Sequence, residues 1–139
     1  MKSIILVFFF LFTTSFSQDY GVIYSALKAN EIYGEVDQSF QISKAILDTT
    51  LNSSENIVMF KFINEECYVF DNSKNVLLGS NHSVEKPAQF YVFSINKIME
   101  LLKLGGSNTV HLEMRENVFT VTVGEYTLED AMWCPPFCD

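Results

Sequence analysis

In the second half of the chain, the spacing of apolar residues changes once. It begins as the spacing of three and four positions that is typical of a helix, and it then becomes the alternation that is typical of a strand. Within residues 95–104, apolar side chains lie three and four positions apart, which is the spacing of one helix face. These side chains are Ile95, Ile98, Met99 and Leu102. Ser94 occupies the position of an N-cap, and Gly105-Gly106 is a typical stop signal. The spacing predicts a helix over residues 95–104.

Alternation of apolar and polar residues begins after this helix. Apolar side chains take every second position in residues 110–114 and again in 119–123, and Glu116-Asn117 between them can turn the chain. We therefore expect a β-hairpin with one buried face, followed by a short strand at 126–128. The polar positions of the first strand are His111, Glu113 and Arg115.

The first half follows the same plan. Residues 58–63 alternate, Asn64-Glu65 can turn, residues 67–70 can pair back, and residues 76–78 form a further apolar strand. The outer face of this hairpin is more apolar than that of its counterpart. We expect it to be covered on both sides.

Two earlier segments are less regular. Residues 19–31 predict a first helix that ends at Gly34, because apolar side chains lie three and four positions apart. Residues 41–51 have helical spacing but end in Thr49, Thr50 and Asn52, which make a poor helix end. This segment is either a helix or a strand.

The two halves can be aligned with each other, which predicts two copies of a strand–helix–strand–strand unit. At an offset of 53, Phe40, Ile42 and Lys44 match Phe93, Ile95 and Lys97. At an offset of 52, Asn56, Val58 and Val69 match Asn108, Val110 and Val121. The fold class is therefore a single small α+β domain. This plan is similar to one domain of a DNA sliding clamp, but the helices here carry mixed charges and the likeness implies no role in DNA binding.

The first residues predict a secretory signal peptide. Lys2 is followed by an apolar run over residues 4–12 and by small polar residues up to Ser17. The run is shorter than the roughly 20 residues that span a membrane. We expect cleavage after Ser17, leaving residues 18–139 as an exported domain, periplasmic or secreted, without a membrane span. The Phe-rich end of this leader resembles leaders of exported proteins from Bacteroidetes-type bacteria.

Charge excludes one class of partner. The chain has 17 acidic and 9 basic residues, for a net charge of −8. No Lys/Arg cluster offsets this excess. An acidic surface repels phosphate, so nucleic acid and anionic membranes are disfavoured.

The cysteines suggest a structural role. Cys134 and Cys138 lie close together in the tail, residues 131–139, and are disulfide candidates in an oxidising compartment. The spacing also suits a metal site, which would need further ligands. Cys67 falls on a predicted buried face, where it is a small hydrophobic residue or the partner of a tail cysteine. The tail either folds back as a lid over the sheet, which we favour, or forms an exposed aromatic contact patch. Its apolar residues are Met132, Trp133, Pro135, Pro136 and Phe137.

Candidate catalytic groups are few. His111 beside Glu113 is a general base or an exposed cross-strand residue, and His82 lies in a polar loop. Glu65-Glu66 and Glu129-Asp130 have the pattern of solvated charge. No nucleophile elbow, phosphate loop or His-Glu-x-x-His motif is present. We predict no catalytic residue, cofactor or metal.

The leading hypothesis is an exported non-catalytic domain that binds a protein partner or acts as an inhibitor. One alternative is an exported enzyme with a dispersed site around His111. The other is a thiol-active or metal-binding protein that acts through Cys134 and Cys138.

Overall fold

Two five-stranded antiparallel sheets form most of the computed structural model, which describes residues 19–80, 89–129 and 131–134. Sheet A has the order β1-β9-β8-β7-β2. Its strands are β1 (Val22–Ser25), β2 (Gln38–Ser43), β7 (Thr109–Arg115), β8 (Val118–Val123) and β9 (Tyr126–Glu129). Sheet B has the order β10-β6-β3-β4-β5. Its strands are β3 (Ile57–Ile63), β4 (Glu66–Phe70), β5 (Val76–Leu78), β6 (Phe90–Ser94) and β10 (Met132–Cys134).

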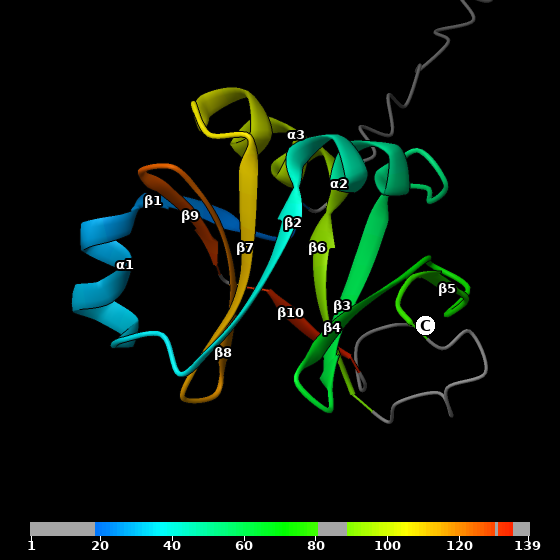
Figure 1. Cartoon of the computed structure of the whole chain (residues 1–139), viewed down its shortest axis with the longest axis horizontal. Helices are drawn as coiled ribbons and strands as arrows, with labels where there is room; N and C mark the ends of the chain where they lie inside the picture. Colours follow the sequence, from blue (N-terminus) through cyan, green and yellow to red (C-terminus); the bar gives the residue numbers. More distant parts are fainter. Residues whose placement is uncertain (1–18, 81–88, 130, 135–139) are drawn as a thin grey trace, which may run out of the picture.

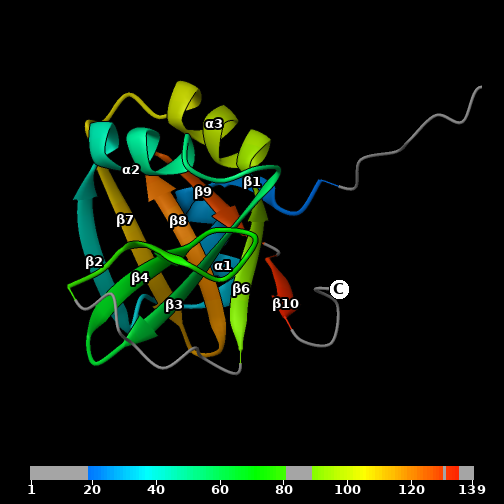
Figure 2. The same cartoon turned by 90° about the vertical axis from the view of Figure 1, so that its right-hand side faces the viewer.

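Three helices among the described residues cover two sides of these sheets. They are α1 (Ala26–Tyr33), α2 (Lys44–Leu51) and α3 (Ile95–Leu104). Helices α2 and α3 lie side by side over one end of the two sheets, and the β3–β4 and β7–β8 turns lie at the opposite end (Figures 1 and 2). Helix α1 lies on the outer face of sheet A (Figure 1). This arrangement confirms the predicted α+β class.

The two predicted copies are present, and they exchange their first strands. One unit is β2-α2-β3-β4-β5 and the other is β6-α3-β7-β8-β9. Strand β2 pairs with β7 of the other unit, with Ile42 opposite Val110. Strand β6 pairs with β3, with Phe93 opposite Val58. Neither unit completes its sheet without the other.

The register of the repeat differs from the predicted alignment in one part. The hairpins match at the predicted offset of 52, since Val58 and Val110 occupy equivalent positions opposite the exchanged strands. In the strand–helix segments the equivalent residues are Ser43 and Ser94, which each precede a helix and are 51 positions apart rather than 53. A slip of two residues keeps every side chain on the same face of a strand, so the hydrophobic pattern does not detect it.

The two less regular segments, residues 19–31 and 41–51, each contain strand residues followed by helix residues. The predicted helix over 19–31 was wrong in its first part, because residues 22–25 pair with β9 as β1 and the helix begins at Ala26. The Ser25 hydroxyl caps it by accepting from the Lys28 amide at 3.2 Å. Gly34 ends it with a φ of 83°, as expected. Residues 41–51 are the end of β2 followed by α2, which the Ser43 hydroxyl caps.

Helix α3 matches its prediction. Ser94 precedes it and Gly105 ends it, the Gly105 amide donating to the Leu101 carbonyl at 2.9 Å. The Ser94 hydroxyl accepts instead from the Tyr20 amide at 2.7 Å. This bond and a second one, from the Ser94 amide to the Tyr20 carbonyl, join the chain before β1 to the end of β6.

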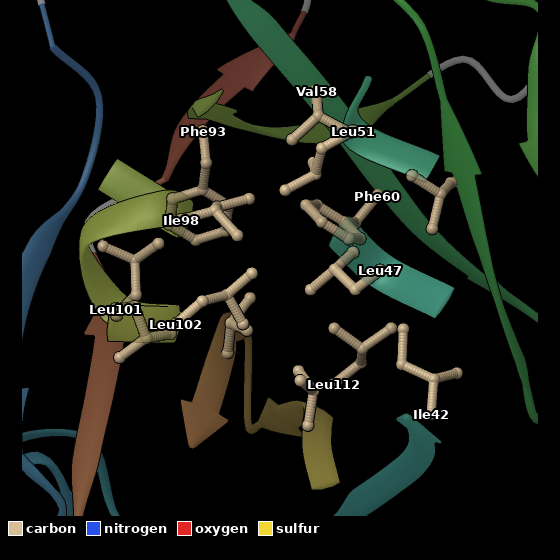
Figure 3. Packing of buried hydrophobic residues seen from close by; sticks show 14 of the residues in the cluster. Ile42, Leu47, Leu51, Val58, Phe60, Phe93, Ile98, Leu101, Leu102 and Leu112 are labelled. Carbon is tan, nitrogen blue, oxygen red and sulfur yellow. The ribbon is translucent and has the colours of Figure 1, made fainter. Parts of the chain in front are cut away.

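The core lies between the sheets and beneath α2 and α3. Leucine and isoleucine side chains of both helices point into this space (Figure 3). They are Leu47, Leu51, Ile98, Leu101 and Leu102, each at most 2% exposed.

Phe119 of β8 holds the centre of this core. Its ring is stacked on Phe60 and Tyr91, with centroids at 5.1 and 5.4 Å. Phe62 and Phe93 contact it at 5.9 and 6.1 Å. One side chain of sheet A therefore contacts four aromatic rings of sheet B.

The outer face of sheet B is also buried, as its apolar composition predicts. Its second hydrophobic cluster consists of Met59, Tyr68, Phe70, Phe90 and Val92, each at most 4% exposed. Among the described residues, no helix has the length and apolar character needed to cross a bilayer.

Replacing Phe119 tests whether it holds the sheets together. We expect Phe119→Ala to lower the free energy of unfolding by about 3–5 kcal/mol, because it leaves a cavity between the sheets. Denaturant titration measures this change. Leu104→Ala is the matched control, since Leu104 is 48% exposed. An effect of Phe119→Ala no larger than that of the control would contradict this role.

Candidate functional site

The space between the sheets is less completely filled at the end opposite α2 and α3. Near the helices, Phe93 and Val110 are 0% exposed. Toward the hairpin turns, Phe62, Tyr91 and Met114 are only partly buried. The open end of the core is therefore where a ligand has access to aromatic side chains.

A cavity of about 570 Å³ lies at this end. Four separate parts of the chain line it: the end of α1, the start of β6, the β7–β8 turn with the start of β8, and the link between β9 and β10. The lining residues are Tyr33, Gln89, Tyr91, Asn117, Val118, Phe119 and Ala131. We call this site the turn-end pocket.

The turn-end pocket combines aromatic surface with neutral polar groups. The Tyr91 ring covers Phe119 at an interplanar angle of 19°, so Phe119, which is 1% exposed, forms a floor. Burial raises the pKa of the Tyr91 hydroxyl, which stays protonated at neutral pH as a donor and acceptor. The exposed Gln89 and Asn117 supply amides. The described lining contains no charged side chain.

Sequence reasoning did not identify this pocket. Its aromatic and amide residues belong to elements far apart in the sequence, and no spacing connects them. Asn117 was assigned only to a turn, where it does lie, and Tyr91 reads as an ordinary strand residue. No pattern in the sequence singled these residues out.

A buried ion pair lies elsewhere, on the outer face of sheet A. A Glu113 carboxylate oxygen accepts from the Arg115 guanidinium at 3.2 Å and from the Thr120 and Thr122 hydroxyls at 3.2 and 2.9 Å. Glu113 is 7% exposed and Arg115 is 2% exposed. The predicted hairpin with a single buried face was therefore wrong at Glu113, Arg115 and Thr120, whose side chains are buried on the second face.

Arg115 connects this network to α1. Its guanidinium donates to the Asn30 side-chain oxygen and, at 2.8 Å, to the Gly34 carbonyl. Its Nε also donates to Thr120 at 3.3 Å. These groups hold the C-terminal end of α1 on the sheet, which is a structural use of both charges.

His111 and Glu113, the first candidates for the alternative enzyme site, lie on the same outer face of β7. His111 lies on the outer face of β7, partly exposed, with Gln41 and Thr122 as its cross-strand neighbours. Glu113, two positions along the strand, is held in the buried ion pair. His82 lies outside the described residues.

The two acidic pairs predicted as solvated charge, Glu65-Glu66 and Glu129-Asp130, differ in the exposure of their described members to solvent. Glu65 is exposed, and the carboxylate of Glu66 accepts from the Ser80 amide and hydroxyl at 2.8 and 2.5 Å. Glu129 is 0% exposed, so its prediction as solvated charge was wrong. Glu129 lies at the end of β9, which pairs with β1 on one side and β8 on the other, and α1 packs against this strand. Asp130 lies outside the described residues.

The cysteines fit a structural role as far as they are described. Cys67 is a free thiol with 0% exposure, and burial raises its pKa well above the ordinary value, so it is a buried hydrophobic residue and forms no bridge to the tail. The predicted Cys134–Cys138 bridge lies outside the described side chains. The tail begins as β10, an edge strand paired with β6, and the rest of the predicted cover over the sheet lies outside the described residues. Within the described ranges, no three potential ligands from His, Cys, Asp and Glu gather at a metal-binding distance.

Removing one partner of the buried ion pair should be costly. We expect Arg115→Met to lower the free energy of unfolding by about 3–5 kcal/mol, because it leaves the Glu113 charge buried without its partner. The double variant Glu113→Met with Arg115→Met should recover part of this loss. Lys28→Met is the control, since the Lys28–Glu31 pair is exposed and worth about 1 kcal/mol or less. Equal effects of Arg115→Met and the control in denaturant titration would contradict a structural ion pair.

Comparisons with known proteins return no match among family models, curated proteins or solved structures. The likeness to a sliding-clamp domain therefore rests on the order of strands and helices alone. It transfers no function to this chain.

Proposed function

We propose that the chain is an exported, non-catalytic domain that binds a ligand in the turn-end pocket. The pocket itself carries this proposal. Its volume of about 570 Å³ lies within the range of roughly 300–1,000 Å³ typical of ligand sites. Like those sites, it combines aromatic surface with a few polar groups.

The arrangement of polar groups favours binding over catalysis. General acid–base chemistry uses groups that gain or lose a proton near neutral pH and lie within reach of the substrate. The described lining consists of tyrosine, phenylalanine, amide and aliphatic side chains. The Glu113 carboxylate, which the sequence offered as a partner of His111, is held in the buried network with Arg115.

The pocket is also held in a defined shape. Tyr91 comes from β6 of sheet B and Phe119 from β8 of sheet A, and their stacking fixes the floor. A preformed site loses little conformational entropy on binding, which supports a role in recognition. The partner of this site is either a small molecule or a group carried by a larger molecule.

A ligand screen tests the binding proposal. We expect some members of a library of uncharged small molecules to shift the amide NMR signals of Tyr91 and Asn117. Tyr126→Ala, outside the pocket and 37% exposed, is the control and should keep binding. A screen without any pocket shift, or hydrolase turnover that His111→Ala removes, would overturn the proposal.

Export is tested by the mass of the protein after secretion. Expressed from the full sequence in a bacterium, the chain should leave the cytoplasm and begin at Gln18, because signal peptidase removes residues 1–17. Phe9→Arg interrupts the apolar run and should leave an uncleaved chain in the cytoplasm. Cell fractionation with intact-mass measurement distinguishes these results. A full-length cytoplasmic protein in both cases would contradict export.

A further inference from the structure

We propose that the ligand of the turn-end pocket is a neutral saccharide unit, an inference that rests on the proposed function. Its first support is the match of hydrogen-bonding groups. The Tyr91 hydroxyl and the Gln89 and Asn117 amides each donate and accept hydrogen bonds. Sugar hydroxyls also do both, so a saccharide satisfies such groups in either direction.

The second support is the aromatic surface. Tyr33 and Tyr91 line the pocket and are partly exposed, and Phe119 forms the floor beneath Tyr91. The apolar C–H face of a pyranose ring packs against such a surface, while its rim of hydroxyls reaches polar groups at the edges. The exposed Gln89 and Asn117 belong to different segments of the lining and offer amide partners to such a rim.

Other classes of ligand fit less well. An anion would enter a pocket whose described lining offers no cation, on a chain of net charge −8. A purely apolar ligand would desolvate the phenol and the amides without replacing their hydrogen bonds, which is costly. An ammonium group prefers several open ring faces around it, whereas Tyr91 and Phe119 are stacked on each other at 19°.

A glycan array followed by NMR titration tests this inference. The array carries neutral and acidic oligosaccharides, and we expect binding to neutral ones. The best neutral glycan is then titrated against labelled protein while the Tyr91 and Asn117 signals are followed. Tyr91→Phe keeps the ring and removes one hydrogen-bonding group, so it should weaken binding about fivefold.

Asn117→Ala should weaken binding by a similar factor, about fivefold, without affecting the core. Its matched control is Asn72→Ala, an exposed asparagine in the loop after β4 that is outside the pocket lining. The control should bind like the unaltered protein. Unchanged affinity in both pocket variants would overturn the inference.

Two further outcomes separate this inference from the proposed function. Pocket shifts with uncharged compounds that are not sugars, together with an array negative for neutral glycans, would overturn the saccharide inference and leave the binding function standing. An array positive only for acidic glycans would overturn it as well. An absence of pocket shifts with every compound would overturn both.

Discussion

The contact of Phe119 with the aromatic rings of sheet B is the interaction on which the structure depends. Phe119 lies on β8, the middle strand of sheet A, and Phe60 and Phe62 lie on β3, the middle strand of sheet B. Helices α2 and α3 close one end of the space between the sheets (Figure 2), and within this space Phe119 contacts the rings of Phe60, Phe62, Phe93 and Tyr91. The same ring is the floor of the turn-end pocket, so core packing and the candidate site share one side chain.

The exchange of first strands makes the two halves depend on each other. Strand β2 reaches the sheet of the second unit and β6 that of the first, so each sheet combines distant segments of sequence. The junctions are equivalent, with the Lys44 amide donating to the Asn108 carbonyl at 2.8 Å and the Ile95 amide donating to the Asn56 carbonyl at 2.9 Å. Contacts of such long range are expected to make folding slower than in a domain built from local hairpins.

Local patterns predicted the elements whose structure depends on local signals. Helix α3 has a clear apolar stripe and a glycine stop, and both hairpins alternate around recognisable turns. The segments that failed depend on distant partners. Val22–Ser25 is a strand because β9 lies beside it, and Glu113 is buried with Arg115, which bonds to Asn30 and Gly34 at the end of α1. No local spacing contains that information.

The turn-end pocket could not be predicted from the sequence, because it too depends on residues that are distant in the chain. Its residues extend from Tyr33 to Ala131 and meet only once both sheets are formed. Their residue types also gave no warning, because aromatic and amide side chains are common in ordinary strands and turns. The charged residues that did attract interest, such as His111 with Glu113, have the types that catalysis requires but lie on a covered or flat face.

The buried ion pair and the turn-end pocket are linked through the end of α1. Arg115 donates to Asn30 and to the Gly34 carbonyl, and these two residues flank Tyr33 in the last turn of the helix. Tyr33 is therefore held against the pocket by a charge buried on the other face of sheet A. A buried ion pair costs desolvation energy and is weak support for stability alone. Its position here fits a second role, which is to fix one aromatic wall of the pocket.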